Sequence, residues 1–297
     1  MSTYATLSQA RNELVADPAD TSQDVFLIQY LHDITGRIDE TFPRWRFEPM
    51  QQMRSQDWSS VDPYSGLLTL DAPLLAPQTI VDGDGATLVL WDGAAATRSA
   101  ANVAPDPLND TPIRALKKLN GQAWQNASGD SGEGIFQITG LWGFRRGYGG
   151  AWKSSLDALT AGTASGATSL PVTNPDGADI TGRTPRFSPG QLIKVNDEFM
   201  HVTATDGVGN TVSVEPEANG TTAASHLSGA IIYTWYPEPT IVRATLRWAA
   251  LLHSRRGHFE QITVDGLGGV TKFPTDMPQE VKNILDQLPM YARIGAV

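Results

Sequence analysis

The sequence predicts an α+β fold, in which the N- and C-terminal helices pack together as a small bundle and a large, mainly antiparallel β insertion in two parts lies between them. Two observations support this prediction. Helical periodicity occurs only near the two ends of the 297-residue chain, whereas the middle contains short β-type runs between turn residues. Because a two-helix hairpin has little interior, we expect the two ends to bury their apolar faces against each other.

Residues 1–44 are predicted to form a helical hairpin. A short first helix is followed by a bend at Asp17-Pro18. The second helix, residues 21–39, is expected to begin at Thr21 or Ser22, which are good N-caps, and to end before Pro43. The apolar positions that share a helix face are Leu7, Ala10 and Leu14 in the first helix and Leu27, Leu31, Ile34 and Ile38 in the second.

The middle of the chain is predicted to contain a first β region, residues 45–158, and a second, small β module, residues 159–237. A low-complexity stretch at 160–167 divides them. Each expected strand is a short apolar or β-branched run bounded by Gly, Asp, Asn or Pro. These runs are residues 87–91, 134–138, 191–195, 211–214 and 230–233.

Residues 238–297 are predicted to complete the helical domain. Pro237 and Pro239 precede a helix of residues 240–256, and a final helix follows Pro278 and stops at Pro289. The apolar face of the first of these helices consists of Ile241, Ala244, Trp248 and Leu251 or Leu252, and its basic end is Arg255-Arg256.

Composition excludes several classes of function. The chain has 22 basic and 32 acidic residues, which give a net charge of −10. A protein that binds nucleic-acid backbones needs the opposite sign of charge. It has no cysteine, so disulfides and thiolate chemistry are absent. Polar residues follow Met1, and no apolar window approaches a membrane span, so we expect a cytoplasm-like compartment and no membrane association.

Two short motifs resemble chemical sites. Residues 129–132, Gly-Asp-Ser-Gly, match the nucleophile motif of chymotrypsin-type proteases, but the one upstream histidine, His32, lies in a helix. Residues 82–85, Asp-Gly-Asp-Gly, resemble a calcium loop without its later carboxylates. We interpret both as turns, and therefore expect no enzymatic activity, no cofactor and no metal. A serine hydrolase acting through Ser131 is the alternative.

Residues 142–148 interleave aromatic side chains with two arginines, a pattern that packs a core or stacks on sugars and bases. We favour packing. The alternative function is a β-rich decoration or receptor protein that binds carbohydrate through Trp142, Tyr148 and Trp152.

Segments near both ends carry a resemblance to a known family. The stretch from Leu7 through Asp24 to Ile38 and Phe42 resembles the opening of head-to-tail connector (adaptor) proteins of tailed bacteriophages. Residues 239–244, 249–251 and 255–256, with Met277-Pro278 to Leu285, are similar to the closing helices of that family.

The middle also resembles phage virion proteins. Residues 138–144, followed by Tyr148 and Trp152, resemble a motif of larger neck proteins, and residues 165–226 resemble a small β module that recurs in phage structural proteins. Small connectors lack so large a β insertion, so the role of the insertion stays open.

The resemblance implies a structural virion protein: a homo-oligomeric ring of twelve copies in the phage neck, assembled in the host bacterial cytoplasm. Its partners would be the portal protein and a head-completion or tail-side neck protein, and DNA would pass through the channel without specific binding. An acidic wall suits that passage because it repels DNA. We expect the ring interface to use Leu27, Leu31, Ile34, Ile38, Ile241, Trp248, Leu252, Arg255 and Arg256, and the portal or partner contact to use Tyr291, Arg293 and Ile294.

Overall fold

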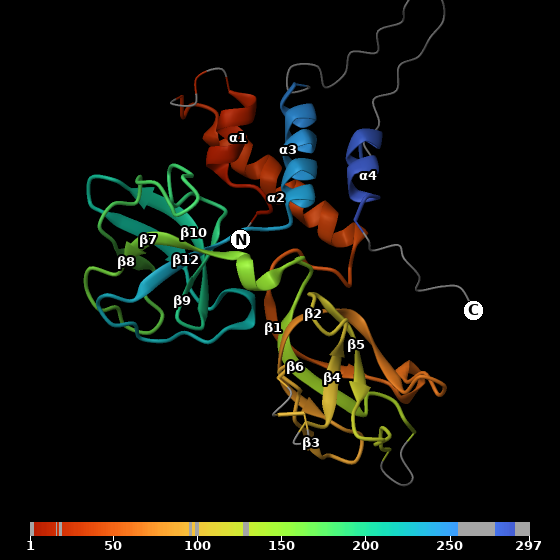
Figure 1. Ribbon diagram of the computed structural model, residues 1–297. Coiled ribbons are helices and arrows are strands. Elements are labelled where there is room, and N and C mark those ends of the chain that lie inside the picture. Colours follow the sequence, from red (N-terminus) through yellow and green to blue (C-terminus); the bar gives the residue numbers. More distant parts are fainter. Residues whose placement is uncertain are drawn as a thin grey trace, which may run out of the picture.

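The computed structural model describes residues 3–15, 17, 20–94, 97–98, 101–126, 131–254 and 277–288. Over these residues the chain forms four α-helices and two six-stranded antiparallel sheets, which confirms the predicted α+β class. Figure 1 shows the helices together at one end of the molecule, with the two sheets below them in separate places.

The four helices are α1 (Leu7–Leu14), α2 (Asp24–Thr41), α3 (Pro239–Ser254) and α4 (Gln279–Leu285). A reciprocal capping box between Thr6 and Gln9 begins α1. The prediction that Thr21 or Ser22 caps α2 is wrong, because the N-cap residue is Gln23 and makes no side-chain cap hydrogen bond. Residues 20–24 form a turn in which the Ser22 N–H donates to Asp20, so the helix begins later than its polar residues indicate.

One apolar cluster contains residues from all four helices, together with Phe47 and Phe144 from the segments that flank the first sheet. α2 packs on α3, and α3 packs on α4. Leu252 is half-buried at the edge of this cluster. Six of the residues expected at a ring interface lie inside it, each no more than 3% exposed: Leu27, Leu31, Ile34, Ile38, Ile241 and Trp248.

These six side chains are therefore taken up by contacts within one chain, and they are not available on its surface. Helical periodicity shows that a helix face is buried, but it does not distinguish burial by the same chain from burial by a neighbouring copy. A contact between copies would need other residues.

The first sheet consists of β1 (Met50–Gln56), β2 (Leu67–Val81), β3 (Thr87–Leu88), β4 (Val103–Asp106), β5 (Ile113–Lys118) and β6 (Phe136–Trp142). Its order is β1-β6-β2-β5-β4, with β3 paired to β2. The long strand β2 contains Pro73 and Pro77, and its pairing register shifts near both. Prolines interrupt a ladder, which explains why this strand was not predicted.

The second sheet consists of β7 (Trp152–Ala158), β8 (Ser169–Pro171), β9 (Leu192–Val195), β10 (Glu198–Asp206), β11 (Thr211–Glu215) and β12 (Ile231–Trp235), in the order β7-β12-β9-β10-β11-β8. Strand β7 falls in the range predicted for the first β region, yet it pairs with β12. The low-complexity stretch at 160–167 is thus a loop inside the second module, tied to it by the Thr163 and His226 backbones.

In both sheets the chain enters and leaves at neighbouring positions. Met50, the first residue of β1, is the register partner of Trp142, the last residue of β6. Trp152, the first residue of β7, is likewise the partner of Trp235, the last residue of β12. Each sheet is therefore connected to the rest of the chain through two adjacent strand ends.

Replacing Trp248 by Ala tests the helical core. We expect the free energy of unfolding to fall by about 3–5 kcal/mol, because the substitution leaves a cavity in a cluster that all four helices share. Chemical denaturation measures it. Val25→Ala is the control, since Val25 lies on α2 with its side chain 64% exposed and should change stability by about 0.5 kcal/mol or less. Equal effects would contradict the assignment of this core.

Candidate functional site

The helices and the two sheets meet at the backbone of Phe47, just before β1. Its N–H donates to the Tyr4 hydroxyl at 3.3 Å, and its carbonyl accepts from Trp235 Nε1 of β12 at 3.2 Å. The Tyr4 N–H in turn donates to Thr35 Oγ1 of α2 at 3.2 Å. All of these groups are buried, so they fix the positions of the three parts relative to one another.

A buried carboxylate forms a second link at this junction. Glu238, 2% exposed at the start of α3, accepts from Arg146 Nη2 at 2.6 Å and lies 3.4 Å from Arg145 Nη1. The Arg146 N–H also donates to it, at 3.2 Å. Because both arginines follow β6, this ion pair joins the end of the first sheet to the first turn of α3.

The aromatic residues of the 142–148 motif pack inside the chain. Trp142 is 2% exposed and donates from Nε1 to the Gln52 carbonyl at 3.0 Å. Tyr148 and Trp152 are half-buried and lie 6.0 and 5.1 Å, centroid to centroid, from the ring of Trp235. These contacts agree with the packing interpretation, and they do not give an exposed stacking platform.

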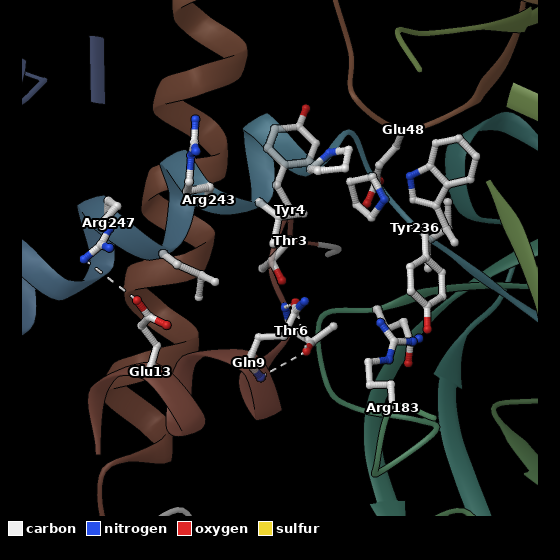
Figure 2. A pocket seen from close by; sticks show the side chains of 17 residues that line it. Thr3, Tyr4, Thr6, Gln9, Glu13, Glu48, Arg183, Tyr236, Arg243 and Arg247 are labelled. Carbon is white, nitrogen blue, oxygen red and sulfur yellow. Dashed lines mark hydrogen bonds and ion pairs between the residues drawn. The ribbon is translucent and has the colours of Figure 1, made fainter. Parts of the chain in front are cut away.

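A cavity of about 440 Å³ lies beside this junction, between the helices and the second sheet. Figure 2 shows Arg243 and Arg247 reaching it from α3, while Arg183 and Tyr236 lie across from them. The lining combines three guanidinium groups, two carboxylates and an apolar wall. It consists of Thr3, Tyr4, Thr6, Gln9, Glu13, Glu48, Arg183, Gln191, Leu192, Trp235, Tyr236, Pro237, Pro239, Val242, Arg243, Leu246 and Arg247.

The three arginines of this cavity are only partly neutralised. Arg247 lies 3.9 Å from Glu13 and 3.9 Å from Glu280, contacts that solvent screens because both carboxylates are exposed. Arg183 lies 3.4 Å from Asp179 and stacks over the Tyr236 ring at 4.3 Å. Arg243 donates to the neutral amide of Gln287 at 3.4 Å and has no carboxylate partner among the described residues. Arg243 is therefore the guanidinium group of this cavity that is open to a carboxylate from another molecule.

A second cavity, of about 460 Å³, shares Tyr4 and Glu48 with the first. Its other polar residues are mostly acidic or imidazole groups: His32, Thr35, Asp39, Glu40, Arg46, His201 and Asn219. His201 Nε2 lies 4.0 Å from Glu48, and its Nδ1 lies 3.8 Å from Glu215. Burial lowers the pKa of His201 to about 4 in spite of these carboxylates, so its imidazole is neutral at pH 7.

The motifs that resemble chemical sites have structural roles where they can be seen. Residues 82–86 form the turn between β2 and β3, and Asp82 pairs with Lys118 at 2.6 Å. Ser131 is exposed, and residues 129 and 130 of its motif lie outside the described residues. His226 Nε2 lies 2.8 Å from a carboxylate oxygen of Glu198, and both side chains are buried inside the protein. No group of three possible metal ligands occurs within the described ranges.

Several predicted contact residues cannot be placed. Arg255, Arg256, Tyr291, Arg293 and Ile294 all lie outside the described residues. Conversely, sequence reasoning missed the residues that build the junction and its cavity, above all Tyr4, Glu48, Arg183 and Arg243. One signal was available: Glu238 is flanked by prolines in the 236–239 stretch, which marks an acid at a fixed backbone turn.

Comparison with protein-family models and with curated proteins finds no match to this chain. In the part of the chain that is described, no helix is both long and apolar enough to span a membrane.

The link through Glu238 gives one prediction. Glu238→Gln keeps the shape of the side chain but leaves Arg145 without its buried carboxylate, so we expect a loss of about 1–3 kcal/mol in the free energy of unfolding. Urea denaturation measures it, with Glu40→Gln on the exposed face of α2 as the matched control. A variant as stable as the control would show that the ion pair does not hold the junction.

The neutral state of His201 gives a second prediction. In the unfolded chain a histidine binds its proton near pH 6.5, whereas in the folded chain His201 binds it only near pH 4. As the pH falls between these values, the unfolded chain takes up a proton that the folded chain does not, so stability decreases, by about 3 kcal/mol in full.

His201→Gln should remove this decrease. The measurement is urea denaturation of the wild type and of the variant, each at pH 7 and at pH 4.5. All other groups titrate in both proteins, so the difference between their two losses of stability reports on His201. Parallel losses of stability in the two proteins would contradict the buried, neutral histidine.

Proposed function

We propose that this chain is a structural subunit of a tailed-phage neck, which forms a ring between portal and tail and extends the DNA channel. The observation that carries the proposal is the resemblance of the two chain ends to head-to-tail connectors. It is supported by the packing of those ends, since residues of α1, α2, α3 and α4 share one apolar cluster.

The architecture that fits this function is a bundle of terminal helices with the β regions inserted into one connection. Both sheets occur between α2 and α3, and each begins and ends at register partners. A helical base of this kind can keep its place in a ring while the sheets reach other parts of the neck. The proposal assigns the chain no catalytic residue and no cofactor.

Charge supports a channel through which DNA moves without being held. A net charge of −10 gives a wall that repels phosphates, so the genome meets no strong binding site on its way. The partners in this proposal are identical copies of the chain, the portal protein and a tail-side neck protein, and its location is the neck of the virion.

Copies of the chain would contact one another through side chains that the isolated chain leaves exposed. Large apolar residues are exposed on both sheets and on α2. The most exposed of them are Val25, Met53, Tyr64, Val89, Leu156, Ile180, Val208 and Leu227. Covering such side chains is the ordinary source of stability in a contact between subunits.

Electron microscopy of the purified chain, alone and mixed with a candidate portal, tests the function. We expect closed rings that stack on one end of the portal, because a head-to-tail contact whose rotation closes generates a ring. Sedimentation velocity gives the mass of the assembly. A chain that stays monomeric at high concentration and ignores each portal offered would overturn the proposal.

A further inference from the structure

One turn of the first sheet holds a fully exposed aromatic residue. Tyr64 lies between the short 3-10 turn Trp58–Ser60 and β2, and its side chain is 98% exposed. An exposed tyrosine ring presents a large apolar surface to water. Aromatic residues are enriched in contacts between proteins, where such a surface is buried.

The turn that carries Tyr64 is held in one conformation. Asp62 accepts from the Tyr64 N–H at 2.9 Å and from the Ser65 hydroxyl, and the Gly66 N–H donates to the Asp62 carbonyl at 2.9 Å. Pro63 restricts the backbone further. Because the turn is already ordered, burying Tyr64 against another surface costs little conformational entropy.

The same turn presents a negative charge. The hydrogen bond from Ser65 and the one from the Tyr64 backbone lower the pKa of Asp62, so its carboxylate is ionised at neutral pH. A carboxylate has about four lone-pair positions, and these bonds leave some of them for another donor. The turn thus offers an aromatic ring and a carboxylate side by side.

The cavity beside the junction is complementary to that pair. Its accessible apolar wall contains the half-buried ring of Tyr236 with Pro239 and Val242, and Arg243 approaches the cavity without a carboxylate partner among the described residues (Figure 2). A volume of about 440 Å³ lies within the usual range of ligand pockets and is far too small for a nucleic-acid duplex.

We propose that the 62–65 turn of one copy inserts into the junction cavity of the next copy, with Tyr64 against the half-buried ring of Tyr236 and the Asp62 carboxylate at Arg243. The turn and the cavity are different surfaces of one molecule, so the contact is head-to-tail and continues from copy to copy. This inference rests on the proposed ring and names the contact that closes it.

Two other exposed apolar residues are alternatives to Tyr64 as the residue that enters the cavity. Val208, in the turn between β10 and β11, is 96% exposed, and Leu227 is 83% exposed. Both are aliphatic, so they bury less area and have no ring to place against Tyr236. Val208 also follows an aspartate, Asp206, and it therefore provides a matched control.

Because the chain has no cysteine, disulfide trapping can test the contact directly. Ser65→Cys places a thiol on the turn next to an intact Tyr64, and Glu13→Cys places one on the exposed rim of the cavity. When the two single variants are mixed and oxidised, a 65–13 bond can only join two copies. We expect this mixed dimer to exceed the one formed by Val208→Cys with Glu13→Cys. Equal yields would overturn the inference.

Sedimentation of full-length variants separates this inference from the proposed function. Tyr64→Ala should weaken self-association about 30-fold, as loss of a central aromatic contact does. Arg243→Glu should weaken it about tenfold, and Asp62→Arg in the same chain should restore it. The control Arg114→Glu, at an exposed position of β5, should have little effect. Normal rings from Tyr64→Ala would overturn the inference and leave the ring intact as a proposal, whereas a wild-type chain that never self-associates would overturn both.

Discussion

The arrangement of the whole molecule depends on the two hydrogen bonds made by the peptide groups of Phe47. One comes from the segment that leads into the helices, the other from the last strand of the second sheet, and Phe47 itself leads into the first sheet. Phe47 belongs to the helical core, whereas Trp235 belongs to a separate apolar cluster that contains Leu75 of β2 and residues of the second sheet. This apolar cluster and a few buried polar contacts, including the Glu238 ion pair, determine how the helices and the two sheets are arranged.

The helices were predictable because their signal is local. Apolar residues at helical spacing mark α2 and α3 in any context, although turn chemistry at residues 20–24 moved the start of α2 beyond its predicted caps. The sheets were harder. All five predicted runs overlap observed strands, but β2 was hidden by Pro73 and Pro77, and β7 was assigned to the wrong β region because its partner, β12, lies far along the chain.

The candidate site could not have been predicted, because no local pattern produces it. Arg183 belongs to a loop of the second sheet and Arg243 to α3, and only tertiary packing brings them to one cavity. The neighbouring cavity has the opposite character, with His201, Asp39 and Glu40 in its lining, and Tyr4 and Glu48 separate the two. An acidic chain thus collects three of its arginines beside one cavity, together with the carboxylates of Glu13 and Glu48.

The first and last strands of each sheet bring the chain back to the place where it entered. Since Met50 lies opposite Trp142, and Trp152 opposite Trp235, a genetic deletion of either strand-rich segment would leave two chain ends that a short peptide can bridge. The helical base would then be rejoined without a change of path. Each sheet is thus a segment that a change in the gene can remove or replace at a single place in the structure.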